Sequence, residues 1–242
     1  MPLHLWLGQS AELGLVILLY VAFVLEVGWW GRRVWGQSAP YRYYGLTWSS
    51  PSFREFLLGL AIALGSFSAL LLLQVGLGWL RVQEVDLLPA IGSGALTALG
   101  VGFAEELLFR GWLLTELEQD LSLSSALWAN SLIFAVLHFL KPLEVIMQTW
   151  VQFPGLVLLG MILVWARRLT AGRLSMAIAL HSGLVWAYYI VNTTQLIVPN
   201  GTVPDWLTGI GGNPLAGLMG LTFLAGMALM VRSQLSTGGR ST

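Results

Sequence analysis

Hydrophobic residues fill long, unbroken stretches of this chain, and short polar segments separate them. A helix needs about 20 mostly apolar residues to cross a bilayer core about 30 Å thick. The stretches are rich in Leu and Ala and lack the alternation of a half-buried strand, so they predict transmembrane helices. Seven stretches are long enough: residues 12–30, 54–80, 88–114, 122–140, 150–167, 173–191 and 214–231.

Composition and charge agree with a membrane-embedded chain. Of the 242 residues, 56% are hydrophobic and 10% charged, whereas soluble domains carry about 25% charged residues. Twelve Lys and Arg balance 12 Asp and Glu, so no net field attracts a polyanion. The chain has no cysteine, which excludes a disulfide framework, a thiolate nucleophile and Cys-bound zinc. We therefore expect an all-α, polytopic transmembrane bundle of about seven spans, an integral membrane protein in contact with the lipid bilayer and not with nucleic acid.

The distribution of cations predicts the orientation. With the N-terminus outside, ten of the 12 Lys and Arg residues lie on the cytoplasmic flanks, and only Arg81 and Lys141 lie on the other side. This bias follows the positive-inside rule, and six spans would break it. We expect seven spans, with the N-terminus outside and the C-terminus cytoplasmic. The first stretch does not resemble a cleaved signal peptide, because its positive charges, Arg32 and Arg33, follow it.

The connecting segments give no sign of a second domain. Residues 31–53 are expected at the inner interface, and residues 192–213, rich in Gly and Pro, are expected to form an outer loop. No internal repeat is visible. The sequence therefore predicts a single integral membrane domain over residues 1–242.

Ionisable side chains inside the predicted spans are rare, and each needs a partner or a function. Such a side chain costs at least about 2.5–3.5 kcal/mol on insertion scales. The exceptions occur in the third, fourth and sixth stretches: Glu105, Glu106 and Arg110, then Asn130 and His138, then His181 and Ser182.

Helix geometry separates the roles of the two adjacent glutamates. Glu106 and Arg110 are four residues apart on one face, which is a good spacing for an ion pair. Glu105 points about 100° away and has no local cation. Such a carboxyl either takes up a proton or finds histidine partners on other helices. Phe134 precedes His138 by four residues, so its ring can support the imidazole.

Small residues form a ridge along the third stretch. Gly94, Ala98 and Gly102 lie on the face that continues to Glu106. Ridges of this kind allow close helix packing in membranes. We interpret this one as a packing surface that can bring the fourth and sixth stretches close to the glutamates.

Taken together, Glu105-Glu106-x-x-x-Arg110, Phe134-x-x-x-His138 and the later His181 resemble the motifs of the CPBP family of intramembrane proteases. This family comprises CAAX proteases and bacteriocin-processing enzymes and is also called the Abi or type II CAAX endopeptidase family. The resemblance covers a core of about residues 90–190. It implies a hydrolase, an intramembrane endopeptidase that cleaves a peptide bond of a membrane-associated protein or peptide. Family members of the CAAX type remove the last three residues of a prenylated protein.

The resemblance also implies roles for individual residues. Glu105 would be the general base that activates water, and His138 would orient and help to deprotonate that water. His181 would stabilise the oxyanion, while Glu106 and Arg110 would hold the site.

The third family motif is usually His-x-x-x-Asn, but Val185 occupies the asparagine position here. The departure affects oxyanion stabilisation, because losing one donor typically lowers kcat by 10²–10³. Ser182 or Asn130 could supply a donor instead.

Two alternatives accompany the metal-free protease. Glu105, His138 and His181 could together bind zinc or another divalent metal with one open position, although we prefer a mechanism without a cofactor. Alternatively, the protein could be a weak or inactive family member that binds or stabilises other membrane proteins. Intramembrane Glu and His also mark transport paths, but no inverted repeat or pair of broken helices is visible. The simplest alternative is a buried polar cluster that only fixes helix register.

Overall fold

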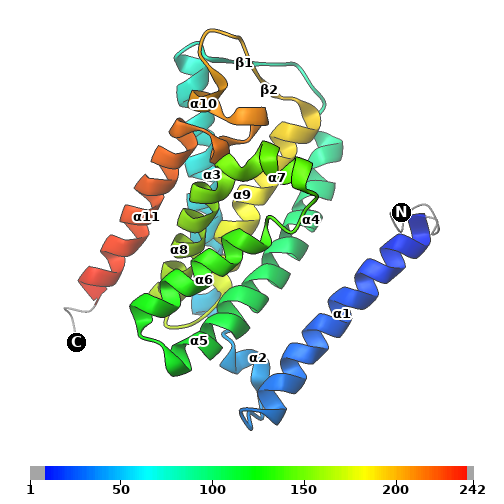
Figure 1. The fold of residues 1–242 in the computed structure, drawn as a ribbon, viewed down its shortest axis with the longest axis vertical. Coiled ribbons are helices and arrows are strands. Elements are labelled where there is room, and N and C mark those ends of the chain that lie inside the picture. The colour runs from blue at the N-terminus through cyan, green and yellow to red at the C-terminus, as the bar shows by residue number, and fades with distance from the viewer. Residues whose placement is uncertain (1–8, 239–242) are drawn as a thin grey trace.

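The computed structural model describes residues 9–238, and it is a bundle of helices (Figure 1). The first half consists of α1 (Gln9–Arg33), α2 (Pro40–Tyr43), α3 (Ser50–Gly76), β1 (Leu80–Val82), α4 (Leu88–Glu106), the π-helix η2 (Leu107–Leu113) and α5 (Leu114–Asp120). The second half consists of α6 (Leu123–Leu137), α7 (Leu143–Thr149), η3 (Trp150–Gln152), α8 (Phe153–Leu169), α9 (Ser175–Thr194), β2 (Ile197–Pro199), α10 (Asp205–Thr208), η4 (Ile210–Gly212), η5 (Pro214–Ala216) and α11 (Leu218–Gly238).

The expected all-α membrane bundle is confirmed, and the chain is a multi-pass integral membrane protein. Within residues 9–238, five helical segments are long and apolar enough to span a bilayer: Leu13–Arg33, Ser50–Gly76, Leu88–Asp120, Leu143–Leu169 and Leu218–Leu235. The apolar helix α6 has 15 residues and is about 22 Å long, which is less than a bilayer core. Helix α9 has 20 residues, but its apolar sequence is interrupted by polar side chains. Seven spans, like the proposed orientation, stay a prediction.

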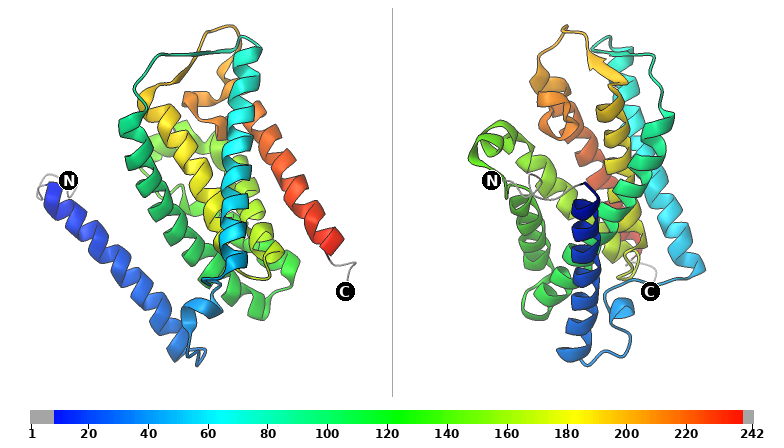
Figure 2. Two further views of the ribbon diagram at one scale, coloured as in Figure 1. Left: turned by 180° about the vertical axis from the view of Figure 1, so that it is seen from behind. Right: turned by 90° about the vertical axis from the view of Figure 1, so that its right-hand side faces the viewer.

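Helix α9 lies at the centre of the bundle. α3 and α4 pack along it, and α8 packs against α6 and α11 (Figures 1 and 2). The first half of α9, Met176–Gly183, is buried on all sides. A helix that is buried all round belongs to the interior of a bundle. His181 is thereby placed in the interior.

The ridge of small residues on α4 forms the contact with α9. The buried residues of α4 recur every four positions: Ala90, Gly94, Ala98, Gly102 and Glu106. A Cβ atom on Gly102 would collide with Ser182 Oγ, and one on Gly94 would lie against the ring of Tyr189. The missing side chains therefore let α9 approach α4, and this stripe ends at Glu106.

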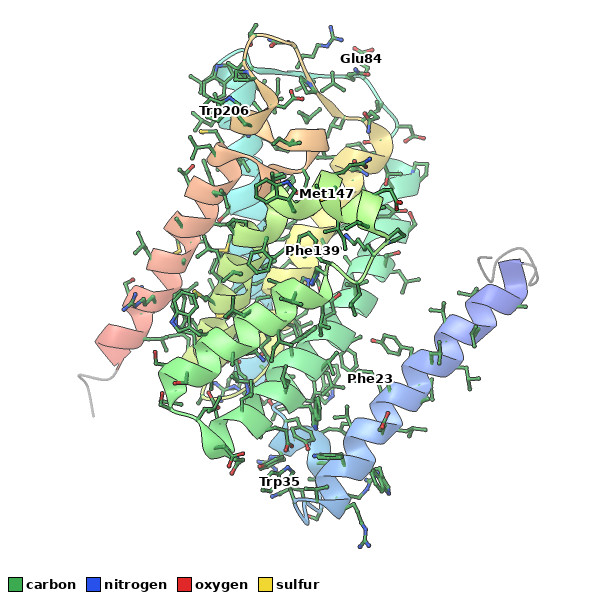
Figure 3. All side chains as sticks on the ribbon, in the orientation of Figure 1. Phe23, Trp35, Glu84, Phe139, Met147 and Trp206 are labelled. Atoms are coloured by element: carbon green, nitrogen blue, oxygen red, sulfur yellow. The ribbon has the colours of Figure 1, made fainter. Side chains whose placement is uncertain are left out.

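Helix α1 joins the bundle through its C-terminal half and diverges from it toward its N-terminus (Figures 1 and 2). The Tyr20 hydroxyl donates to the Gly100 carbonyl at 3.1 Å. The indole N–H groups of Trp30 and Trp35 donate to Glu116 Oε1 at 3.1 and 2.7 Å. Phe23 lies on the side of α1 that faces the bundle, whereas Trp35 lies at its lower end (Figure 3). One half of α1 therefore packs on protein and the other half does not.

Two local features differ from the sequence expectation. The connecting segments contain a short antiparallel pair, β1 and β2, in which Arg81 lies opposite Val198. This pairing satisfies backbone groups in segments that hydropathy alone describes as loops. In addition, the helix expected over residues 88–114 is not uniformly α-helical, because η2 follows Glu106 directly. π-helical turns are rare in proteins, and those that occur are often located at functional sites.

Most arginines gather at one end of the bundle. This end is formed by the C-terminus of α1, by α2, by the start of α3 and by the α8–α9 turn (Figure 1). It holds Arg32, Arg33, Arg42, Arg54, Arg167, Arg168 and Arg173. Arg240, which the orientation prediction also counts, lies outside the described residues.

Candidate active site

Three helices bring one carboxylate and two imidazoles to a common point. Glu105 Oε2, near the end of α4, lies 3.8 Å from His138 Nε2 and 3.8 Å from His181 Nε2. These separations are too long for direct hydrogen bonds. They leave room for a water molecule that bonds to more than one of the three groups. The side chains of Glu105 and His138 are each 30% exposed, whereas Glu105 Oε2 itself is buried and has no hydrogen-bond partner among the described residues.

The other ring nitrogen of each histidine is fixed by an acceptor. His138 Nδ1 lies 2.7 Å from the Phe134 carbonyl, which is one of the unpaired carbonyls at the end of α6. His181 Nδ1 lies 2.8 Å from Glu106 Oε1. Carbonyl and carboxylate oxygens only accept, so both Nδ1 atoms carry hydrogen. In the neutral rings, both Nε2 atoms therefore present a lone pair toward Glu105.

Glu106 and Arg110 form a fully buried ion pair behind the imidazoles. Arg110 Nη1 donates to Glu106 Oε1 at 2.8 Å, and both side chains are 0% exposed. Arg110 Nη2 also donates to the Gly160 carbonyl on α8 at 3.3 Å. A buried pair survives desolvation only with good geometry and further hydrogen bonds. His181 and the Gly160 carbonyl supply such bonds, while Glu106 Oε2 and Arg110 Nε are buried without a partner among the described residues.

Phe134 is the apolar support of the site. Its buried ring lies 4.5 Å from the His138 ring and 6.0 Å from the His181 ring, measured between centroids. The guanidinium carbon of Arg110 lies 4.3 Å from the same ring, within the range of a cation–π interaction. Phe134 therefore contacts both histidines and the buried cation, and it limits how far each can move.

Asn130 and Ser182, the two donors suggested by sequence for the oxyanion, are both directed elsewhere. Asn130 Nδ2 donates one of its two hydrogens to the Phe109 carbonyl at 2.7 Å, which orients this amide toward η2. Ser182 Oγ is buried against Gly102 on α4. Neither residue lines the cavity that contains the two histidines.

A mainly apolar cavity of about 230 Å³ opens beside the imidazoles. It is lined by His138 and His181 together with residues of α3, α8, α9 and α11, among them Phe67, Leu156, Leu184, Val185, Tyr188 and Met227. The cavity therefore brings apolar surface to the edge of the polar centre.

Two side-chain amides, those of Gln152 and Asn213, also line this cavity. The rings of Phe139 and Phe153 lie 6.0 Å apart, which places the start of α8 beside the His138 segment. Asn213 Oδ1 accepts from the Leu215 N–H at 2.9 Å, so its orientation is fixed. The sequence assigns no role to either amide, because no motif spacing links Gln152, near the start of the stretch 150–167, or Asn213, at the end of the segment 192–213, to the histidines.

Glu105, His138 and His181 also form a candidate donor set for a metal ion. One carboxylate and two imidazoles are chemical types that zinc accepts, and tetrahedral ligands would lie about 3.3 Å from one another. The observed separations from Glu105 are 3.8 Å, and within residues 9–238 no group of three or more His, Cys, Asp or Glu is arranged to hold a metal ion. The metal-dependent mechanism therefore stays an alternative to the metal-free one.

The central part of the chain matches the model of a known protein family. Residues 88–187 match a family model described as "Type II CAAX prenyl endopeptidase Rce1-like". The matched segment contains the two glutamates, Arg110, Phe134 and both histidines. It supports assignment to the CPBP, or CAAX protease, family, whose members are integral membrane proteases. No curated protein and no solved structure matches the chain.

Proposed function

From this family assignment, we propose that the protein is an intramembrane endopeptidase in which Glu105 activates a water molecule. The observation that carries the proposal is the convergence of Glu105 Oε2 with the Nε2 atoms of His138 and His181, each at 3.8 Å. A water molecule at this point can donate to a carboxylate and to an imidazole lone pair at once.

The chemistry is peptide-bond hydrolysis by general base catalysis. The water oxygen attacks the carbonyl carbon of the scissile bond, and Glu105 accepts the proton that the water loses. The C–N bond then breaks, and the same proton passes from Glu105 to the departing amine. His138 holds the attacking water through its Nε2 lone pair, because the Phe134 carbonyl keeps the hydrogen on Nδ1.

His181 is the proposed electrophile. Its Nδ1–H donates to the carboxylate of Glu106, whereas that of His138 donates to a neutral carbonyl. A carboxylate behind an imidazole orients the ring and stabilises its protonated form. In this role His181 carries hydrogen on both ring nitrogens throughout the reaction, and its Nε2–H donates to the developing oxyanion, where such donors have their largest effect.

We assign the second oxyanion donor to the side-chain amide of Gln152. Val185 cannot donate, although it lines the same cavity as His181. Gln152 lines this cavity together with both histidines and belongs to the segment packed beside His138. Its amide N–H is the donor type that the asparagine of the usual motif would supply. Asn213 is the second candidate.

The substrate of this reaction is a membrane-associated protein or peptide. The cavity beside the histidines is mostly apolar and holds about 230 Å³. Such a cavity suits an apolar side chain or a lipid-like group next to the scissile bond. The position of the site among membrane-spanning helices favours substrates presented from the bilayer.

The proposal is tested by comparing membranes that contain the wild-type protein or the variant Glu105→Gln. Peptide termini of membrane proteins are compared by mass spectrometry, and we expect an uncut precursor to accumulate in the variant. Glu26→Gln is the matched control, because Glu26 is an exposed glutamate on α1, far from the histidines in sequence. Identical termini in all three samples would refute the protease proposal.

The second candidate function is a non-catalytic one, favoured by the valine at position 185. A protein that binds or stabilises other membrane proteins needs the fold but not Glu105. Full biological activity of Glu105→Gln would support this candidate. A metal-dependent protease is distinguished separately, since its peptidase activity would be lost in strong chelator and regained on adding zinc.

A further inference from the structure

A second cavity lies at the arginine-rich end of the bundle. It holds about 640 Å³ and is lined by residues Arg42–Ser49, except Tyr44, and by the α8–α9 turn. None of its lining residues lines the cavity beside the histidines. Three arginines, Arg42, Arg167 and Arg173, line it, and no acidic residue does. Arg173 is ion-paired with Glu55, so Arg42 and Arg167 supply the unbalanced charge.

Arg167 is a buried cation with no carboxylate in ion-pair contact; Glu118, which acts on it electrostatically, is itself paired with Arg168. It is 8% exposed, and within residues 9–238 it forms no ion pair. Its Nη2 donates to Thr115 Oγ1 at 2.9 Å, and its Nε donates to the Gly172 carbonyl at 3.3 Å. Its Nη1 is buried and has no hydrogen-bond partner among the described residues. A buried charge in this condition is unfavourable unless an anion neutralises it.

The N-terminus of α3 adds further positive potential to this cavity. Ser49 is the N-cap of this helix of 27 residues and lines the cavity. The first turn of α3 contains no acidic residue. The positive end of the helix dipole is therefore not compensated within the helix, and helix N-termini favour phosphate and similar anions.

The walls of the cavity are held together by backbone contacts. The Leu174 N–H donates to the Gly45 carbonyl at 2.9 Å. Gly45 has φ +93°, and a Cβ atom there would collide with the Gly172 carbonyl. Ala171 and Gly172 are both left-handed, with φ values of 52° and 87°. A non-glycine residue in this conformation is strained and persists where its surroundings hold it. The cavity is therefore preformed.

The surroundings of the cavity indicate a membrane interface. Trp48 lies on the rim with its side chain completely exposed, and tryptophan is enriched at headgroup level. The cavity lies between the α2–α3 junction and the α8–α9 turn, at the end where arginines gather (Figure 1). Basic pockets between helices on the cytoplasmic side suit anionic lipid headgroups.

We propose that this cavity binds the phosphate group of an anionic phospholipid headgroup. Arg42 offers an exposed guanidinium at the rim, and Arg167 contributes positive charge from the wall, where its Nη1 is covered by protein. Guanidinium groups match phosphate oxygens in charge and in geometry. Trp48 packs beside the headgroup at the interface. The bound lipid neutralises Arg167 and joins the segment Arg42–Ser49 to the α8–α9 turn.

The experiment measures lipid binding to the full chain purified in a neutral detergent, by native mass spectrometry with titration. The probes are phosphatidylglycerol, phosphatidylcholine and inorganic phosphate. We expect phosphatidylglycerol to bind more tightly than phosphatidylcholine. Arg42→Ala should weaken phosphatidylglycerol binding about fivefold, which is the effect of one basic residue near an anionic surface. Arg33→Ala, an exposed arginine outside the cavity, is the matched control and should leave binding unchanged.

A second variant tests the buried arginine without removing its charge. Arg167→Lys keeps the cation but loses the planar fork, so we expect weaker phosphatidylglycerol binding in a chain that remains folded. Equal binding of the two lipids, or an equal effect of Arg42→Ala and Arg33→Ala, would overturn the proposal. Binding of inorganic phosphate that depends on Arg42, without lipid binding, would keep the phosphate site and overturn its lipid source. The readout does not involve peptide cleavage, so it is independent of the proposed protease function.

Discussion

His181 Nδ1 lies 2.8 Å from Glu106 Oε1, in a contact between two buried side chains that are 75 residues apart. The same oxygen accepts from Arg110 Nη1, also at 2.8 Å. One carboxylate atom therefore positions the imidazole of α9 and neutralises the cation of η2. This contact gives the two adjacent glutamates different tasks, because Glu105 faces the Nε2 atoms while Glu106 holds the ring from behind.

Replacing Glu106 should destabilise the fold and impair the site together. In Glu106→Gln the Arg110 cation is left without a counter-ion in a fully buried position. Removing one partner of a buried pair typically costs about 3–5 kcal/mol. We expect this loss in the free energy of unfolding, measured by denaturant titration in mixed micelles.

The double variant Glu106→Gln/Arg110→Met is the control for this prediction. It removes both charges, so no uncompensated ion is left in the buried position. The free energy of unfolding should return toward that of the wild-type protein. Peptidase activity should stay low, because His181 still lacks its carboxylate. Full activity in the double variant would contradict the positioning role of Glu106.

His138 should matter for catalysis much more than for stability. Its side chain is 30% exposed and lies at the end of α6, so its removal leaves no closed cavity in the core. We expect His138→Ala to lower kcat by about 10²–10⁴, the range for a lost acid–base group, with little change in KM. Steady-state kinetics and a thermal unfolding curve on the same sample provide the check. A large fall in stability with unchanged kcat would assign His138 to structure.

The proposed role of Gln152 predicts a rescue. Gln152→Ala should lower kcat by about 10²–10³, as expected for one lost oxyanion donor. Val185→Asn introduces an amide into the same cavity, four residues after His181, at the position the usual motif prescribes. The double variant Gln152→Ala/Val185→Asn should therefore recover activity. If Gln152→Ala retains its full kcat while Asn213→Ala loses it, the donor is Asn213.

Gly102 should be sensitive to the addition of a single methyl group. In Gly102→Ala the new Cβ collides with Ser182 Oγ and pushes α9, with His181, away from α4. Overpacking of this kind typically costs about 1–3 kcal/mol, and we expect peptidase activity to fall as well. Gly100→Ala is the matched control, because a Cβ there meets no atom within 4 Å. Equal effects of the two substitutions in unfolding experiments would show that the α4–α9 contact does not position the site.

Local pattern was sufficient for several features of the protein. The apolar stretches predicted a helical membrane protein, and the four-residue spacings placed Glu106 beside Arg110 and Phe134 beside His138. Such features depend on side chains within one or two helical turns, whose relative positions the helix itself sets. The hydrophobic pattern did not predict the length of α6 or the β1–β2 pair, because helix ends and strand pairing depend on neighbouring segments.

The sequence by itself determined that this chain is a membrane-embedded helical protein with Glu106 and Arg110, and Phe134 and His138, at helical spacing. Only the tertiary structure decided that Glu105 lies close to both Nε2 atoms and that Glu106 holds His181. It also placed Gln152 in the lining of the cavity beside both histidines. It also decided that Arg167 lies buried without an anion. These relationships depend on the rotation, tilt and separation of helices distant in the chain, which close packing fixes and no local spacing encodes.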